Sequence, residues 1–283
     1  MSLFNYTTIN VRLNKANHTL FIEFNRPLEN QKVNFEMLFE LESVLAWASN
    51  KVEISTILFT STSDYFCQGL DESNLGETPE KMEKVLSRVR KIIEALPELP
   101  QITICDLKKG AKGIGAEFSL FCDMRIADEN SEIAFNHLLN GMTPSCGGIA
   151  LLAECAGNSI ARQLIYTGKS VSAKKLEACG FLSEIYNDEN ANEIVNSVLA
   201  SIDQTSNVAR IQSKMAFRQL ITSKIESGLK IENKISKANL YTYDWKEAIK
   251  AKVENRDPSF MAAKSFTYAL ERAKNELIEE LKP

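Results

Sequence analysis

The sequence of 283 residues predicts an α/β core followed by a helical C-terminal part. Short β-rich runs alternate with amphipathic helical runs through the first half of the chain. Between residues 147 and 202 the runs carry only the helical pattern. The composition is 44% hydrophobic and 25% charged, which is ordinary for a globular protein with a sizeable core. Alternating strands and helices that give way to helices are typical of an α/β core with a helical extension.

The first elements are two strand-like runs, INVRL (9–13) and TLFIEF (19–24), joined by the polar turn NKANH. This pattern predicts a hairpin, followed by a loop over 25–33. Asn34 is a good N-cap, and the apolar residues after it recur at helical spacing, which predicts a helix over 35–49. The run ISTILFT (54–60) predicts the next strand, before a loop over 61–78.

Prolines mark the next helix, because Pro79 opens a pattern over 79–96 that Pro97 and Pro100 end. QITICDL (101–107) predicts a strand. The later helical runs cover 147–157, 158–168, 172–180 and 189–202. Near the C-terminus, helical spacing of apolar residues predicts an amphipathic helix that carries Phe266, Leu270, Ala273, Leu277 and Leu281.

Charge and cysteine usage exclude several classes of protein. The net charge of −4, without a long run of like charge, argues against a nucleic-acid-binding surface. No apolar run approaches the ~20 residues that span a bilayer, and the N-terminus lacks a signal-peptide pattern. The six cysteines contain no CxxC pair, which favours reduced thiols over a disulfide framework or a metal site. We therefore expect a cytoplasmic protein without a membrane or nucleic-acid partner and without a bound metal.

The stretch GAKGIGAEFSLFCDMRIAD (110–128) places one carboxylate, Glu117, among apolar residues. An unpaired buried carboxylate costs several kcal/mol, so this position calls for a partner or a function. A dinucleotide site is rejected, because the third glycine of GxGxxG would fall at Phe118. Backbone N–H groups at a helix start can instead form an oxyanion hole, and Glu117 lies one turn beyond Ile114. Two interpretations stay open: a catalytic carboxylate, or a structural one paired with Arg125 or a backbone amide.

Five segments occur in the order and spacing of a known family: NRP (25–27), FCQGLD (66–71), the 110–128 stretch, GMTPSCGG (141–148) and DWKEAIKAKVENRDPSF (244–260). From about residue 9 to residue 260 the chain resembles the crotonase (enoyl-CoA hydratase/isomerase) superfamily. The resemblance implies a crotonase-type spiral of ββα turns over 1–200, and a helical trimerisation or lid region over 201–283. It also implies an acyl-CoA or acyl-carrier-protein thioester as substrate, no cofactor apart from the coenzyme A of that substrate, and a homotrimer or hexamer.

The same resemblance assigns site residues. The thioester oxygen would lie between the backbone N–H groups of Leu70 and Ile114, whose side chains are larger than the Ala and Gly that are frequent there. Glu117 matches the first of the two carboxylates with which family hydratases activate water. Counting back from Gly141 places His137 at the second, with Asn136 and Asn140 as alternatives. Contacts to substrate or coenzyme A are expected from Arg26, Gln68, Gly69, Asp71, Gly113 and Lys252.

A histidine in place of the second carboxylate argues against simple hydration, although a lone His beside Leu138 also fits a structural role. We expect a lyase or isomerase that stabilises a thioester enolate in the oxyanion hole with a single Glu as acid/base, as in fatty acid metabolism. One alternative is a dehydratase or decarboxylase of branched acyl thioesters in polyketide biosynthesis, which YTTINVRL and FNHLLNGMTPSC resemble more weakly. Another is a non-catalytic thioester-binding protein. Lys252, where the family often has Phe, either meets a phosphate or carboxylate or is simply exposed.

Overall fold

The computed structural model describes residues 4–71 and 78–260. A six-stranded sheet has the order β1-β2-β3-β4-β6-β9, and a three-stranded sheet has the order β5-β7-β8. The pair β1–β2 is antiparallel, whereas the other neighbours in the larger sheet are parallel. The strands are β1 (Ile9–Asn14), β2 (Thr19–Phe24), β3 (Thr56–Ser61), β4 (Ile102–Asp106), β5 (Gly110–Lys112), β6 (Met124–Asp128), β7 (Glu132–Ala134), β8 (Val171–Ser172) and β9 (Glu184–Tyr186).

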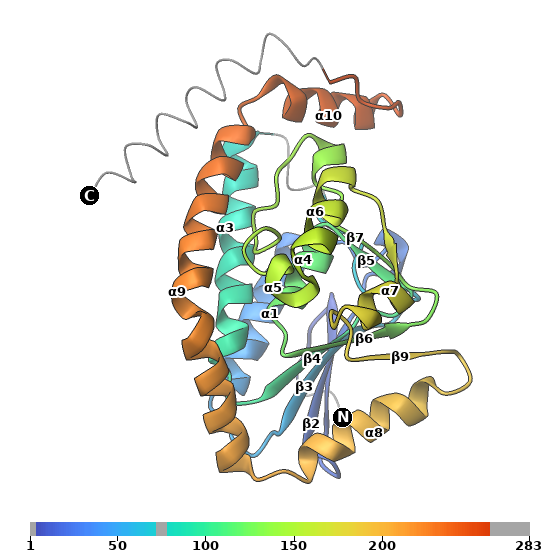
Figure 1. Ribbon diagram of the computed structural model, residues 1–283, viewed down its shortest axis with the longest axis vertical. Coiled ribbons are helices and arrows are strands. Elements are labelled where there is room, and N and C mark those ends of the chain that lie inside the picture. The colour runs from blue at the N-terminus through green and yellow to red at the C-terminus, as the bar shows by residue number, and fades with distance from the viewer. Residues whose placement is uncertain (1–3, 72–77, 261–283) are drawn as a thin grey trace.

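Helices follow most of the strands and make up the described C-terminal part (Figure 1). The α-helices are α1 (Phe35–Ala48), α3 (Pro79–Ala95), α4 (Ile114–Leu120), α5 (Leu152–Ala156), α6 (Asn158–Thr167), α7 (Ala173–Ala178), α8 (Ala191–Asp203), α9 (Asn207–Asn239) and α10 (Tyr243–Val253). Short 3-10 helices are η1 (Pro27–Glu29), η2 (Leu96–Glu98) and η3 (Leu138–Asn140).

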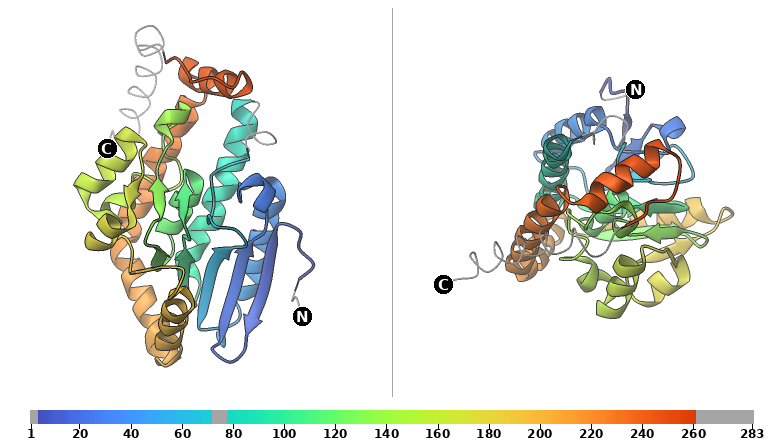
Figure 2. Two further views of the ribbon diagram at one scale, coloured as in Figure 1. Left: turned by 90° about the vertical axis from the view of Figure 1, so that its right-hand side faces the viewer. Right: turned by 90° about the horizontal axis from the view of Figure 1, so that it is seen from above.

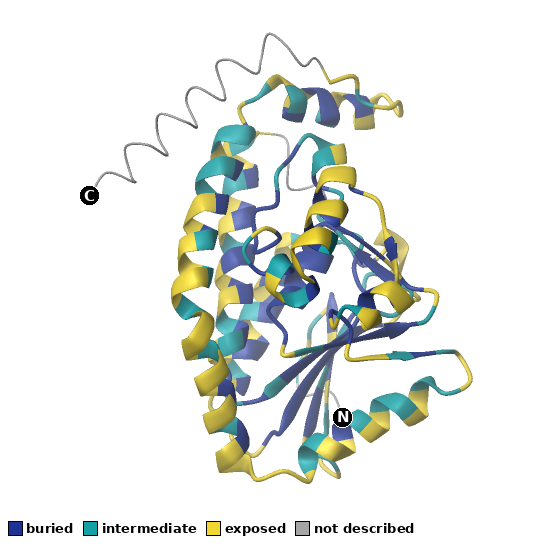
Figure 3. Ribbon diagram, viewed as in Figure 1, coloured by how far each residue is buried: buried dark blue, intermediate teal, exposed yellow. Residues whose placement is uncertain are grey.

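The long helix α9 runs beside α3 for much of its length (Figure 1). An ion pair between Lys237 and Glu83 and another between Arg218 and Glu98 join opposite ends of the two segments, so the helices are antiparallel. Figure 2 shows α10 at the end of the molecule opposite α8. The strands of the larger sheet are mostly buried, whereas the outer face of α9 is exposed (Figure 3).

Aromatic packing fixes the position of α4. Phe118 makes an edge-to-face contact with Phe59, with ring centroids 5.0 Å apart, and Phe24 stacks on Phe66 at 4.8 Å. Such pairs add to the stabilisation from burial. Because Phe118 directly follows Glu117, this cluster also fixes the backbone that carries the carboxylate.

The predicted hairpin, the helix that begins after Asn34 and the helix that begins at Pro79 are present. The predicted helix over 147–157 is wrong in its first part, because α5 begins only at Leu152. Gly147 has φ 97°, which is outside the helical region. The short strands after residue 107 were not predicted, and the predicted helix around Phe266 and Leu270 lies outside the described residues.

Candidate active site

A cavity of about 220 Å³ lies between the loop before Asp71, the start of α4 and the segment around η3. Glu117 and His137 line it together with Leu70 and Ile114. The other lining residues are Lys32, Gln68, Gly69, Leu86, Gly113, Asn136, Asn140, Met142, Ser145 and Lys252. The cavity therefore combines the expected proton-transfer residues with the expected backbone donors.

Glycines allow the start of α4 to approach the loop around Cys67. A Cβ added at Gly115 would lie 2.6 Å from both the Cβ and the carbonyl oxygen of Cys67. Gly113, at φ 52°, turns the chain into the helix, and the Lys112 amide donates to the Cys67 carbonyl at 2.9 Å. Since only glycine allows this approach, the sequence GIG brings Leu70 and Ile114 to one wall of the cavity.

Leu70 and Ile114, whose backbone N–H groups are the expected donors, both line the cavity. The Val33 amide donates to the Gly69 carbonyl and the Asp71 amide donates to the Val33 carbonyl, each at 2.9 Å, so this bridge does not use the N–H of Leu70. Ile114 is the first residue of α4, where an N–H has no intrahelical acceptor. Neither N–H donates to another backbone group within residues 4–71 and 78–260.

Glu117 is fully buried and is held by hydrogen bonds on both oxygens. Its Oε1 accepts the backbone N–H groups of Ser145 at 3.0 Å, Cys146 at 2.9 Å and Gly148 at 3.1 Å. Its Oε2 lies 3.0 Å from Nε2 of His137. Arg125 instead donates to backbone carbonyl oxygens, among them that of Phe181 at 2.7 Å. Of the structural partners considered for Glu117, the structure therefore shows the backbone amides and not Arg125.

The contact between Glu117 and His137 sets their protonation. Burial opposes the charge on Glu117, but His137 and the backbone donors outweigh it, so the pKa of Glu117 lies below its ordinary value. Burial likewise opposes the charge on His137, but the carboxylate of Glu117 outweighs it, so the pKa of His137 is raised. Both shifts favour a buried pair of carboxylate and imidazolium.

Among the three candidates for the group that faces Glu117, the structure places His137 in contact with it. Asn136 and Asn140 also line the cavity, and the Asn140 side chain donates to the Asn136 carbonyl at 3.0 Å. The Leu138 side chain packs against the hydrophobic core next to them. His137 is thus both buried and part of the cavity wall.

The remaining expected contact residues divide into two groups. Gln68, Gly69, Gly113 and Lys252 line the cavity. Arg26 and Asp71 form an ion pair at 2.7 Å and are not among the lining residues. This ion pair joins the loop after β2 to the residue that follows Leu70. It therefore lies where it can hold the cavity wall at Leu70 in place.

Glu232 of α9 was not singled out by the sequence, although it lies directly behind the site. Its carboxylate accepts the N–H groups of Gly147 and Ile149 at 2.9 Å each and of Ala150 at 2.5 Å. Burial, and then the charge on Glu117, raise the pKa of Glu232 to about 7. One sequence signal could have identified Glu232. It is a carboxylate among the residues that form the buried face of a helix, as for Glu117.

No group of three or more His, Cys, Asp or Glu side chains that could hold a metal occurs in the described ranges. The six cysteines are free, and four of them are buried. Across the part of the chain that the structure covers, the helices are too short or too polar to cross a membrane.

A family model described as enoyl-CoA hydratase/isomerase matches residues 14–263. The chain belongs to this family. The 2,3-dehydroadipyl-CoA hydratase of Escherichia coli is 25% identical over 249 residues, which cover 88% of this chain and 97% of that protein. The short-chain-enoyl-CoA hydratase of Clostridium acetobutylicum is 26% identical over 253 residues, covering 87% and 95%.

Solved structures of the enoyl-CoA hydratase/isomerase family have the same fold. An enoyl-CoA hydratase from Mycobacterium avium subsp. paratuberculosis superposes with a TM-score of 0.81 at 19% identity, covering 91% of this chain and 100% of that one. An enoyl-CoA hydratase from Bacillus anthracis gives a TM-score of 0.73 at 26% identity, with coverage of 91% and 100%. The predicted family and its crotonase fold are therefore confirmed.

Proposed function

We propose that this family member processes an acyl-CoA thioester by moving a proton at the carbon next to the thioester carbonyl, with Glu117 as the single carboxylate acid/base. The observation that carries this proposal is the direct contact between Glu117 Oε2 and His137 Nε2, at 3.0 Å, in a cavity lined by Leu70 and Ile114. Acyl-CoA thioesters are the substrates of the family.

In the proposed mechanism the thioester oxygen accepts the N–H groups of Leu70 and Ile114. These donors stabilise the negative charge that develops on oxygen when the adjacent carbon loses a proton. Removing one such donor from an enzyme typically lowers kcat by about 10²–10³. Both groups belong to the backbone of packed segments, so little reorganisation is needed as the enolate forms.

Glu117 then exchanges the proton with the substrate carbon. Its Oε1 already accepts three N–H groups, whereas His137 occupies one of the two acceptor positions of Oε2. Oε2 is therefore the oxygen that takes and returns the proton. Against the effect of burial, the carboxylate of Glu117 raises the pKa of His137, which favours the imidazolium form, and the charge of that form stabilises the carboxylate form of Glu117.

The direct contact also supports a choice between reaction types. A hydratase that uses two carboxylates activates a water with both of them, whereas here the group that faces Glu117 is the imidazole of His137, at 3.0 Å. We therefore propose an isomerisation or a decarboxylation that passes through the enolate, rather than simple hydration. Relatives that are named hydratases share the scaffold, and the histidine is the basis for this difference.

The test uses deuterium incorporation from D₂O and turnover of a panel of enoyl-, hydroxyacyl- and glutaconyl-CoA thioesters, followed by mass spectrometry. Glu117→Gln should abolish exchange and turnover while thioester affinity changes little, because Gln keeps the shape of the side chain. Glu226→Gln, at an exposed position of α9, is the matched control and should behave like the wild type. Unchanged turnover in Glu117→Gln would contradict the proposal.

A second candidate function is thioester binding without turnover. It is favoured by the four hydrogen bonds of Glu117, which are what a purely structural carboxylate would also need. This candidate predicts that the wild-type protein binds acyl-CoA but incorporates no deuterium at the substrate carbon. Exchange by the wild type that is lost in Glu117→Gln decides against it.

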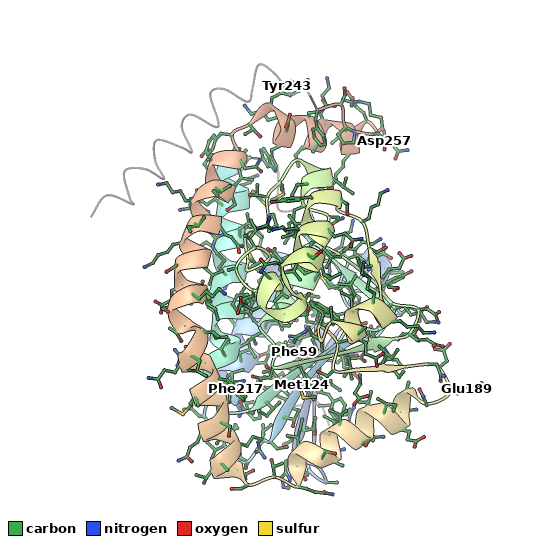
Figure 4. All side chains as sticks on the ribbon, viewed as in Figure 1. Phe59, Met124, Glu189, Phe217, Tyr243 and Asp257 are labelled. Atoms are coloured by element: carbon green, nitrogen blue, oxygen red, sulfur yellow. The ribbon has the colours of Figure 1, made fainter. Side chains whose placement is uncertain are left out.

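We also propose that the protein assembles as a homotrimer or a pair of trimers. Met215, Phe217 and Leu220 on α9 are exposed apolar side chains, and Figure 4 shows Phe217 on this helix. Phe217 and Leu220 are three positions apart and so share one face of the helix, and neighbouring exposed apolar side chains are typical of interfaces between proteins. Sedimentation of the purified protein should give the mass of a trimer or hexamer, and a monomer at micromolar concentration would contradict this.

A further inference from the structure

Two buried carboxylates from distant parts of the chain bind one loop. Glu117 accepts the N–H groups of Ser145, Cys146 and Gly148. Glu232 accepts those of the three other residues of the loop, Gly147, Ile149 and Ala150. Every N–H group from residue 145 to residue 150 therefore donates to one of two carboxylates, and the two sets interleave where Gly147 lies between Cys146 and Gly148.

The helix that carries Glu232 is docked on the same loop. A Cβ added at Gly228 would lie 2.5 Å from the Cβ of Ala150, so the backbone of α9 approaches the loop as closely as packing allows. Glu232 is one helical turn beyond Gly228, on the same face, and its side chain is 1% exposed. The position of the carboxylate is thus determined by backbone packing.

We propose that Glu232 is a positioning residue for the active site, because it binds three amides of the loop whose other three amides hold Glu117. Neighbouring peptide units share an α-carbon, so Gly147 cannot shift without moving the Cys146 and Gly148 amides on either side. Loss of the Glu232 carboxylate then loosens the hydrogen bonds to Glu117. Only the predicted effect of Glu232 on activity rests on the proposed function. The hydrogen bonds that link Glu232, the loop and Glu117 do not depend on it.

The protonation of Glu232 connects this loop to pH. The titratable or charged groups around it are Glu117 of α4, His137 before η3 and Cys146 of the loop, while Arg90 of α3 donates to the Ser145 carbonyl at 3.4 Å. With a pKa of about 7, Glu232 loses its proton near neutral pH and then accepts the three N–H groups at full strength. Because burial and the charge on Glu117 raise this pKa above the ordinary 4.5, the charged carboxylate costs free energy in its buried position, so the stabilisation from Glu232 is lost as the pH rises from 4.5 through about 7.

Amide hydrogen exchange, resolved residue by residue by NMR on the full chain, tests the proposal. In Glu232→Ala the amides of Gly147, Ile149 and Ala150 should exchange roughly tenfold faster or more, and those of Ser145, Cys146 and Gly148 should accelerate similarly. Glu232→Gln, which keeps one acceptor oxygen, should lie in between. Glu226→Gln, at an exposed position of the same helix, should leave all six unchanged.

Two results would overturn the proposal. If only the three amides bonded to Glu232 accelerate, the two carboxylates act independently. If the amides of β3 and β4 accelerate as much as the loop, Glu232 stabilises the whole fold and does not position the site. Glu232→Asp serves as a further variant if Glu232→Ala fails to fold, and its shorter side chain should give the same pattern with a smaller amplitude.

Histidine NMR gives a second readout, because the chain contains only His18 and His137. Glu232 faces His137 as a negative charge, so Glu232→Gln should lower the titration midpoint of His137, with the exposed His18 signal as reference. An unchanged titration midpoint of His137 in Glu232→Gln would contradict the arrangement in which Glu232 faces His137. Deuterium incorporation into an acyl-CoA should also slow in Glu232→Gln. If the wild type shows no such activity, the proposed function fails while amide exchange and titration still decide on Glu232.

Discussion

Gly148 lies so close to Glu117 that an added Cβ would be 2.8 Å from the Oε1 atom of the carboxylate. The N–H of the same glycine donates to that oxygen at 3.1 Å. The hydrogen bond and the close approach depend on each other, because a side chain at residue 148 would push the carboxylate away from its donor. Glycine at this position is thus a requirement of the site.

We predict that Gly148→Ala destabilises the fold by about 1–3 kcal/mol and lowers exchange activity strongly, because the added methyl group displaces Glu117. Gly157→Ala is the control, since a Cβ there meets no atom within 4 Å and only its φ of 78° is unfavourable. That control should lose about 1 kcal/mol and keep its activity. Urea denaturation and deuterium incorporation measure the two effects, and equal activity in both variants would contradict the prediction.

The N–H of Ile114, which we propose as an oxyanion donor, can be removed with little disturbance of α4. Proline is tolerated at the first position of a helix, where its missing N–H has no intrahelical partner. Ile114→Pro should therefore lower kcat by roughly 10²–10³ while the protein still folds. Ile114→Ala keeps the N–H and should lose stability without a comparable loss of kcat. If the two variants have the same kcat, this N–H does not contact the substrate oxygen.

The Glu117–His137 pair predicts a pH-dependent contribution to stability. Because the pKa of His137 is raised, its stabilisation is fully present below the ordinary value of 6.5 and is lost as the pH rises through the folded-state pKa. Because the pKa of Glu117 is lowered, its stabilisation is present above 4.5 and is lost as the pH falls through the folded-state value. The contribution of the pair is thus largest between these limits.

Urea denaturation of the wild type and His137→Asn over a range of pH measures this contribution. The difference in unfolding free energy should be largest between pH 4.5 and 6.5 and shrink at more alkaline pH. His18→Asn, at an exposed position, controls for loss of a histidine elsewhere in the fold. A difference that does not vary with pH would show that no ion pair forms.

Lys214 joins α9 to the sheet side of the molecule through a buried ammonium group. Its Nζ lies 2.7 Å from Asp123 Oδ2 and donates to the Gln101 carbonyl at 2.7 Å, and its side chain is 4% exposed. Lys214→Met should cost about 1–3 kcal/mol, because it leaves the carbonyl oxygens of Leu96 and Gln101 without their donor. Lys224→Met, which breaks an exposed pair with Glu154, should cost less than about 1 kcal/mol. Similar losses of unfolding free energy in Lys214→Met and Lys224→Met would contradict a stabilising role for the buried ammonium group of Lys214.

The sequence allowed Glu117 to be found because a charged residue in an apolar helix is a local signal. The contact with His137 was one of three alternatives, since the spacing after Phe135 did not define which side chain turns inward. Residues 147–150 of the loop that binds Glu117 were predicted as the start of a helix over 147–157. Its actual conformation is set by carboxylates that lie 28 to 31 and 82 to 85 residues away, and no local pattern encodes such contacts.

Glu232 was missed for a related reason. Helix α9 carries many charged residues, and its amphipathic pattern is weakened by Lys214 and Glu232, which are both buried. Leu229, Glu232 and Ser236 nevertheless share the buried face at helical spacing. A carboxylate on such a face is the same signal that drew attention to Glu117, and it would have identified this residue.

The division of one loop between two carboxylates has a consequence for biosynthesis. Glu117 precedes its three amide donors closely in the chain, whereas Glu232 follows its own donors by more than eighty residues. During translation the first carboxylate can bind the loop well before the second has been made. The amides of Gly147, Ile149 and Ala150 have no carboxylate acceptor until α9 has been made and docks, so this helix completes the loop that holds Glu117.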